Sequence, residues 1–220
     1  GSWYQQENCL PHQFESHPMN TIPLIVPGFH GSGPTHWQSW LEDMLPESRR
    51  VTGIDWEQPI LRVWADAIVR CIDNCPKPVI IVGHSFGCLA STLAVLERPK
   101  QVAGVLLVAP ADPERFAAQG VRKSTDPGSG ASVGALLPSR GLGTTGLVIA
   151  STNDPWMTFA KARTWAGIWE LSLYNAGRVV HINVDSGHGP WPLVCELLQA
   201  LQVALDESVT LPQLLRDAQH

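Results

Sequence analysis

A pentapeptide of the form Gly-x-Ser-x-Gly lies near the middle of the 220-residue chain. It reads Gly83-His84-Ser85-Phe86-Gly87, directly after an apolar run and directly before a stretch with helical periodicity. In that context the motif predicts a nucleophile elbow, a tight turn that raises a serine hydroxyl above the edge of a sheet. A serine in this position is also a common helix cap, but the strand before it and the helix after it favour the nucleophile.

A serine hydroxyl needs a base to take its proton, and the base needs an acid to orient it. Two aspartates are candidates for the acid, because each follows an expected strand: Asp154 in Ser151–Trp156 and Asp112 in Val108–Asp112. In folds with this elbow the acid follows the elbow serine and precedes the histidine, usually after a late strand. We therefore expect Asp154 to be the acid, with Asp112 as the alternative.

Two histidines downstream are candidates for the base, His181 and His188. If the last strand is Glu170–Tyr174, His181 lies in the loop after it. If the last strand is Arg178–Ile182, His188 takes that position instead. The pattern alone leaves the choice open.

The loop Val26–Pro34 follows the first expected strand and is rich in glycine. Its Phe29 N–H, together with the Phe86 N–H of the elbow, is a candidate oxyanion hole, in which one donor contributes about 3 kcal/mol to lowering the barrier. No Gly-Lys-Ser/Thr follows the loop, which excludes a phosphate-binding P-loop. His30 in this loop, Trp156 after the acid and Trp191 after the histidines are candidates for the substrate pocket.

The elements that must position these residues alternate between apolar runs and helix-like periodic runs. Runs such as Val79–Val82 are typical of strands that are buried on both faces of a parallel sheet. The sequence therefore predicts an α/β three-layer sandwich with a mostly parallel sheet and helices on both faces. The expected strands are Pro23–Val26, Val51–Asp55, Pro78–Val82, Gly104–Ala109, Gly146–Ser151, Glu170–Tyr174 and Arg178–Ile182. The expected helices are Thr35–Leu45, Ile60–Cys75, Ser85–Glu97, Thr158–Gly167, Pro192–Leu205 and Leu211–Ala218.

Residues 110–145 interrupt this alternation with a stretch rich in Gly, Ser and Pro. A stretch of this length within a compact domain is typical of a lid or a disordered loop. We expect one domain over residues 20–220, with residues 110–145 as its loop or lid. Residues 1–19 begin Gly-Ser without Met and are expected to be a flexible tag or extension.

The composition excludes several classes of protein. With 15 Lys and Arg and a net charge of −5, the chain lacks the basic surface that nucleic-acid binding requires. No apolar run is long enough to span a membrane, and no secretory signal is visible. The five cysteines are scattered without a metal-binding spacing, so we expect reduced thiols, no metal, no cofactor and a cytoplasmic location.

Several stretches together resemble the small α/β-hydrolase-fold serine hydrolases related to retinoblastoma-binding protein 9 and bacterial YdeN. The resemblance covers residues 22–200 and rests on Leu24–Gln38, Asp55–Pro59, Val82–Ala90, Asp154–Trp156 with Ala162, Trp165 and Trp169, and His181–Asn183 with Ser186-Gly187 and Gly189–Pro192. It implies Ser85 as nucleophile, Asp154 as acid and His181, rather than His188, as base. In one departure, Val180 precedes His181 where the family usually has glycine.

The expected activity is hydrolysis of a small carboxylic ester, or of an amide or thioester, through an acyl-enzyme. The partner is then a small ester or acyl substrate, and no organic cofactor is implied. One alternative is an acyltransferase that uses the same three residues. A second is a protein-binding module that has kept the fold without catalysis; the family's name reflects a protein partner, although no feature of this sequence identifies one.

Overall fold

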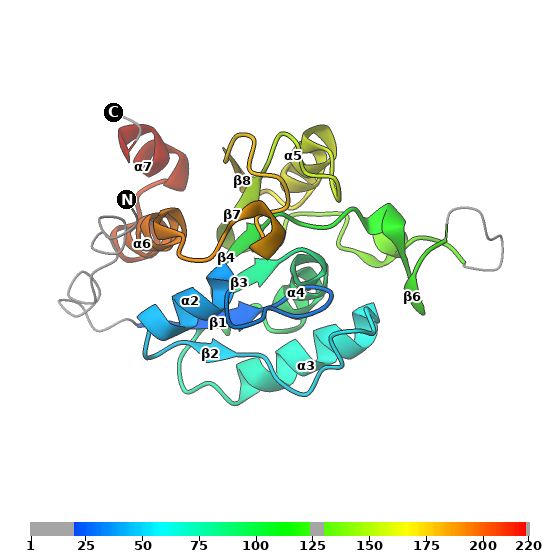
Figure 1. Cartoon of the computed structure of the whole chain (residues 1–220). Coiled ribbons are helices and arrows are strands. Elements are labelled where there is room, and N and C mark those ends of the chain that lie inside the picture. Colours follow the sequence, from blue (N-terminus) through cyan, green and yellow to red (C-terminus); the bar gives the residue numbers. More distant parts are fainter. Residues whose placement is uncertain (1–19, 124–129, 219–220) are drawn as a thin grey trace.

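Six parallel strands form the central sheet of the molecule (Figure 1). The computed structural model describes residues 20–123 and 130–218. In spatial order the strands are β2 (Arg49–Arg50), β1 (Ile22–Val26), β3 (Val79–His84), β4 (Val102–Val108), β7 (Thr145–Ala150) and β8 (Ser172–Asn175). Because the chain runs from β1 outward to β2 and then returns to β3, the strand order reverses beside β1. Crevices beyond the carboxyl ends of the strands at such a point are the usual ligand sites of open α/β sheets.

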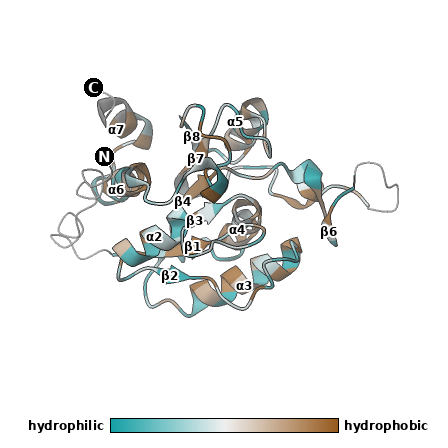
Figure 2. Ribbon diagram, viewed as in Figure 1, coloured by the Kyte–Doolittle hydropathy of each residue, from teal (hydrophilic) through white to brown (hydrophobic). Residues whose placement is uncertain are grey.

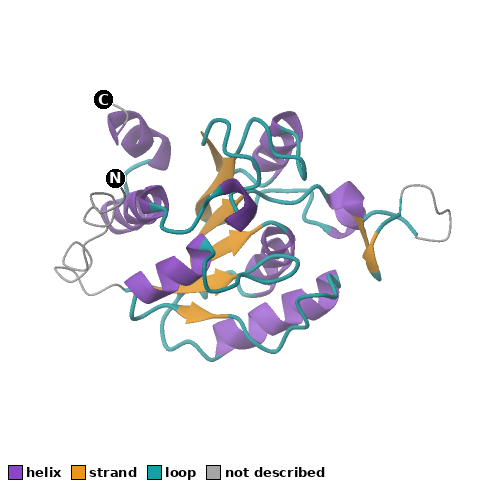
Figure 3. Ribbon diagram, in the orientation of Figure 1, coloured by secondary structure: helices purple, strands orange, loops and turns teal. Residues whose placement is uncertain are grey.

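Helices cover both faces of the sheet and complete three layers (Figure 3). On one face lie α3 (Leu61–Asp73), α4 (Phe86–Glu97) and α5 (Phe159–Ile168). On the other lie α2 (Trp37–Met44) and α6 (Pro192–Glu207), with α7 (Leu211–Ala218) packed beside α6. The predicted α/β sandwich is confirmed, and the six predicted helices are present with small differences at their ends.

The alternation of side chains along each strand explains why the sheet needs both helical layers. In β3, Val79 and Ile81 join the apolar core under α3 and α4, whereas Ile80 and Val82 join the core under α2 and α6. All four side chains are fully buried. Helix α3 carries both hydrophobic and hydrophilic residues along its length, as a helix with one exposed face requires (Figure 2).

The segment between β4 and β7 is largely irregular, as predicted. Its described residues, 109–123 and 130–144, include two 3₁₀ turns, η2 (Pro113–Arg115) and η4 (Val133–Leu136), and the antiparallel pair β5 (Phe116–Ala117) and β6 (Gly120–Val121). The pair projects from the body of the molecule (Figure 1). Its role as a lid stays a prediction.

Two predicted strands are wrong. Val51–Asp55 is irregular, because pairing with β1 ends at Arg50 and Gly53 adopts a φ of 80°. Arg178–Ile182 is a turn, because Val180 and Ile182 adopt φ values of 54° and 51°, which extended backbone excludes.

Three cysteines, Cys71, Cys75 and Cys88, are free thiols. Cys195 is disulfide-bonded, so the expectation of reduced thiols is wrong for that residue. Cys9, like the whole predicted extension 1–19, lies outside the described residues. Within the described ranges no helix is both long and apolar enough to cross a bilayer.

Candidate active site

Ser85 occupies the sharp turn between β3 and α4. Its backbone has a φ of 55° and a ψ of −122°, a conformation that L-residues rarely adopt and that is characteristic of strained functional turns. Gly87 permits the turn, because a Cβ at this position would lie 2.3 Å from the carbonyl oxygen of Pro27. The side chain of Ser85 therefore stands at the carboxyl edge of the sheet, at the N-terminus of α4.

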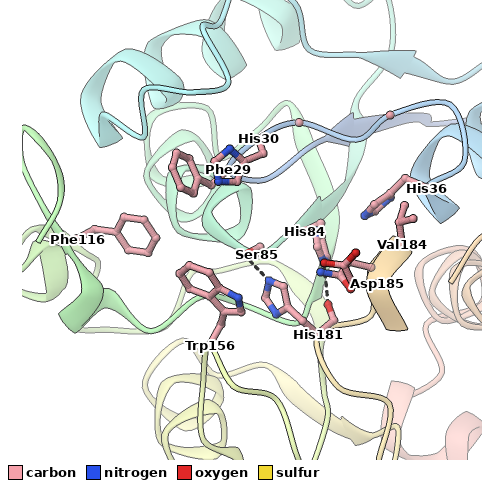
Figure 4. Close-up of a pocket in the computed structure, with 13 residues that line it drawn as sticks. Phe29, His30, His36, His84, Ser85, Phe116, Trp156, His181, Val184 and Asp185 are labelled. Atoms are coloured by element: carbon pink, nitrogen blue, oxygen red, sulfur yellow. Dashed lines mark hydrogen bonds between the residues drawn. The ribbon is translucent and has the colours of Figure 1, made fainter. Parts of the chain in front are cut away.

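A continuous chain of hydrogen bonds joins Ser85 to His181 and Asp154. The Oγ of Ser85 lies 2.8 Å from Nε2 of His181, and Nδ1 of His181 lies 2.9 Å from both carboxylate oxygens of Asp154. The side chains of His181 and Asp154 are 8% and 2% exposed, so water is largely excluded from this ion-pair geometry. Figure 4 shows the ring of His181 directed at Ser85.

Each of these residues follows a different strand of the sheet. Ser85 follows β3, Asp154 lies in the loop after β7, and His181 lies in the loop after β8. The Asp154 Oδ1 also accepts a hydrogen bond from the Trp156 N–H at 2.8 Å, which fixes the carboxylate within its own loop. Parallel pairing of β7 with β8 places both loops at the same edge.

The two alternatives from the sequence are engaged elsewhere. Asp112 forms an ion pair with Lys161, at 2.7 Å between Oδ2 and Nζ, and its Oδ1 accepts the Glu114 N–H. His188 hydrogen-bonds through Nδ1 to the hydroxyl of Ser186, at 2.8 Å. The structure thus brings Asp154 and His181 to Ser85, and gives Asp112 and His188 other partners.

The two backbone N–H groups expected in the oxyanion hole flank the serine. Phe86 is the first residue of α4, so its N–H has no acceptor within the helix. Phe29 follows Gly28, where a Cβ would lie 2.9 Å from the Cβ of Ser85. The loop after β1 therefore lies directly against the elbow. Within the described chain, neither N–H has a backbone acceptor.

A cavity of about 270 Å³ opens above Ser85. Figure 4 shows Phe29, Phe116 and Trp156 on one side of the serine, and His36, Val184 and Asp185 on the other. The cavity thus has an aromatic end and a more polar end. Its lining comprises Phe29, His30, Gly31, Gly33, His36, His84, Ser85, Phe116, Trp156, His181, Asn183, Val184 and Asp185.

The structure places two of the three predicted pocket residues, His30 and Trp156, in this lining. Trp191 packs elsewhere: its ring centroid lies 5.1 Å from that of Trp37 and 5.7 Å from that of His188. Reasoning from the sequence missed Phe116, which comes from the irregular segment where no pattern marks it. It also missed Asp185, although its position four residues after His181 could have indicated that it lies near the site.

Two buried histidines surround the base and are uncharged at neutral pH. Burial, and then the nearby His181, hold the pKa of His84 well below its usual range. Burial, and then the positive charge of Arg50, lower the pKa of His36 to about 4. Because these neighbouring rings carry no charge, they do not repel the positive imidazolium that His181 forms when it takes a proton as a general base.

The hydrogen bonds of these rings assign their protons. His36 Nδ1 accepts the Gln38 N–H at 3.0 Å, so its Nε2 carries the proton; that atom is buried without a partner in the described chain. His84 Nε2 lies 2.9 Å from the carbonyl oxygen of His181, which makes it a donor. Within residues 20–123 and 130–218 no group of three or more His, Cys, Asp or Glu side chains could hold a metal ion.

The chain is similar to several known hydrolases in sequence and in structure. Residues 23–200 match a family model described as serine hydrolase. A YdeN-like hydrolase from Pectobacterium atrosepticum is 34% identical, with a TM-score of 0.77 over 90% of this chain and 98% of that one. The ydeN gene product from B. subtilis is 22% identical, with a TM-score of 0.63 over 82% and 98%. Est1E from Butyrivibrio proteoclasticus, solved with ferulic acid bound, is 15% identical, with a TM-score of 0.60 over 85% and 88%, and shares the fold. No curated protein matches the chain.

Proposed function

The chain belongs to the serine hydrolase family and has YdeN-like relatives, and from this we propose that it cleaves a small carboxylic ester through an acyl-enzyme. The observation that carries the proposal is the hydrogen-bonded sequence Ser85–His181–Asp154. Residues 20–220 act as one catalytic domain, with residues 110–145 as its lid.

In the first step the Ser85 Oγ attacks the ester carbonyl carbon while His181 Nε2 takes the hydroxyl proton. The negative charge that develops on the carbonyl oxygen is stabilised by the N–H groups of Phe29 and Phe86. His181 then returns the proton to the leaving alcohol oxygen as the C–O bond breaks. Asp154 accepts a hydrogen bond from Nδ1 throughout, which fixes the ring tautomer and stabilises the imidazolium.

In the second step water replaces the alcohol. His181 takes a proton from the water, the hydroxide attacks the acyl carbon, and the proton passes to the Ser85 Oγ as the acid leaves. The cycle uses one water for each ester and regenerates the hydroxyl, so no cofactor is needed.

The substrate class follows from the cavity. About 270 Å³, with three aromatic rings at one end, accommodates a compact apolar or aromatic group and not a long acyl chain. We expect p-nitrophenyl acetate and benzoate to have a higher kcat/KM than p-nitrophenyl laurate. A laurate preference would contradict this assignment of the cavity.

Labelling with a fluorophosphonate, followed by intact-mass measurement, tests the nucleophile. We expect one adduct on the wild-type protein and none on Ser85→Ala. An unlabelled but folded wild-type protein would refute the hydrolase mechanism and favour the protein-binding module. A cytoplasmic location stays a prediction.

A further inference from the structure

The backbone on both sides of His181 is strained. Val180 and Ile182 have φ values of 54° and 51°, in the left-handed region. Both side chains are β-branched, the class for which this region is a genuine outlier. Such conformations persist only where surrounding contacts impose them, so the contacts of this loop determine where the histidine lies.

Asn153 holds the loop on the side of the acid. Its Oδ1 accepts the Val180 N–H at 2.9 Å and the Ser151 hydroxyl at 2.9 Å. The Ser151 Oγ in turn accepts the Val179 N–H at 3.2 Å. The residue that directly precedes Asp154 thus binds the residue that directly precedes His181.

His84 holds the loop on the side of the nucleophile. Its Nε2–H donates to the carbonyl oxygen of His181 at 2.9 Å, and the Trp37 Nε1–H donates to the carbonyl oxygen of Ile182 at 2.8 Å. His84 directly precedes Ser85. Asp154 and Ser85, the two hydrogen-bond partners of His181, therefore each directly follow a residue whose side chain binds the backbone of the loop that carries His181.

We propose that Asn153 is a positioning residue for His181, with His84 as the anchor on the opposite side. This inference rests on the proposed hydrolase function. When Val180 loses its acceptor, the residue relaxes to negative φ and displaces the imidazole from Ser85. A displacement of about 1 Å in a reacting group costs about 100-fold in rate. Most of the cavity wall, including the aromatic end formed by Phe29, Phe116 and Trp156, lies outside this loop, so substrate binding should change much less than turnover.

The test compares three variants in the hydrolysis of p-nitrophenyl acetate. Asn153→Ala removes the acceptor, and we expect kcat to fall by about 100-fold with KM within about two-fold of wild type. Asn153→Asp retains the oxygen that makes both hydrogen bonds, and we expect kcat within a few-fold of wild type. Asn175→Ala is the matched control, because the Asn175 Oδ1 binds the Gly177 N–H of the same loop at 2.8 Å without touching the base; we expect wild-type kcat.

A double variant tests the role of strain. Glycine adopts positive φ without penalty, so we expect the double variant Asn153→Ala/Val180→Gly to have a kcat about ten-fold higher than that of Asn153→Ala alone. A double variant no faster than Asn153→Ala would overturn the strain argument. Should Asn153→Ala fail to fold, Asn153→Ser, whose hydroxyl is too short to reach Val180, takes its place in both comparisons.

The outcomes separate this inference from the function on which it rests. A wild-type protein that labels with fluorophosphonate, beside an Asn153→Ala protein with unchanged kcat, overturns the positioning role alone. Loss of activity in Asn175→Ala equal to that in Asn153→Ala also overturns it, since the effect would then belong to the whole loop. A folded wild-type protein that neither labels nor hydrolyses overturns both proposals.

Discussion

Acidification should destabilise the fold through the imidazole of His36. The ordinary pKa of histidine is 6.5, and burial together with Arg50 lowers that of His36 to about 4 in the folded protein. Between these values the unfolded chain binds a proton at this residue and the folded chain does not. The free energy of unfolding therefore falls as the pH falls through this range, and the contribution is fully present only above pH 6.5.

The size of the effect follows from the same pKa difference. One pKa unit between the folded and unfolded states is worth about 1.4 kcal/mol, so the difference from 6.5 to about 4 gives about 3 kcal/mol. That is a large part of the stability of a typical domain, about 5–15 kcal/mol. The loss should be complete near pH 4.

The variant His36→Asn isolates the contribution. Asparagine is a strong helix N-cap, so it retains an acceptor for the Gln38 N–H at the start of α2 but has no proton to gain. In urea unfolding at pH 7 and pH 4, the wild-type protein should lose about 3 kcal/mol more than the variant. His84 and His188 are present in both proteins, and burial, the largest cause of their lowered pKa values, acts on them in both. Equal losses in the two proteins would refute the reasoning.

Three further predictions concern the site directly. Asp154→Asn should lower kcat by about 10⁴ by removing the acceptor that fixes the base, whereas Asp112→Asn should leave esterase activity within a few-fold; the reverse ranking would transfer the role of acid. His181→Ala should abolish ester hydrolysis and His188→Ala should retain most of it, as steady-state assays at one pH will show. Gly87→Ala should fail to reach the native state, because the added Cβ would lie 2.3 Å from a backbone oxygen; a wild-type melting temperature for this variant would contradict the described elbow.

The parts of the site that depend on local sequence were predictable. The elbow at Ser85 needs only a strand, a helix and the motif between them, all of which are visible in the sequence. Asp154 follows from the order of the strands. The choice between His181 and His188 does not follow from the order of the strands, because it depends on where β8 ends. The turn after β8 is held by side chains from three other parts of the chain, which no local pattern reveals.

Other errors have a tertiary cause. Trp191 follows the base loop, but it packs against Trp37 from α2, a contact that the sequence pattern does not reveal. Phe116 reaches the cavity from an irregular segment without periodicity. Val180 stands where the resembling family usually has glycine, and its left-handed backbone is the conformation that glycine favours.

The position of β8 at the edge of the sheet determines how the protein should lose activity on heating. Within the described residues this four-residue strand pairs with β7 alone, and its residues are half-buried or, at Asn175, exposed. Short edge elements with few buried contacts detach at lower free energy than the core. Detachment of β8 would carry the loop of His181 away from Ser85 while the buried strands stay paired. Inactivation should therefore precede global melting, and amide hydrogens of β8 should exchange well before those of β3.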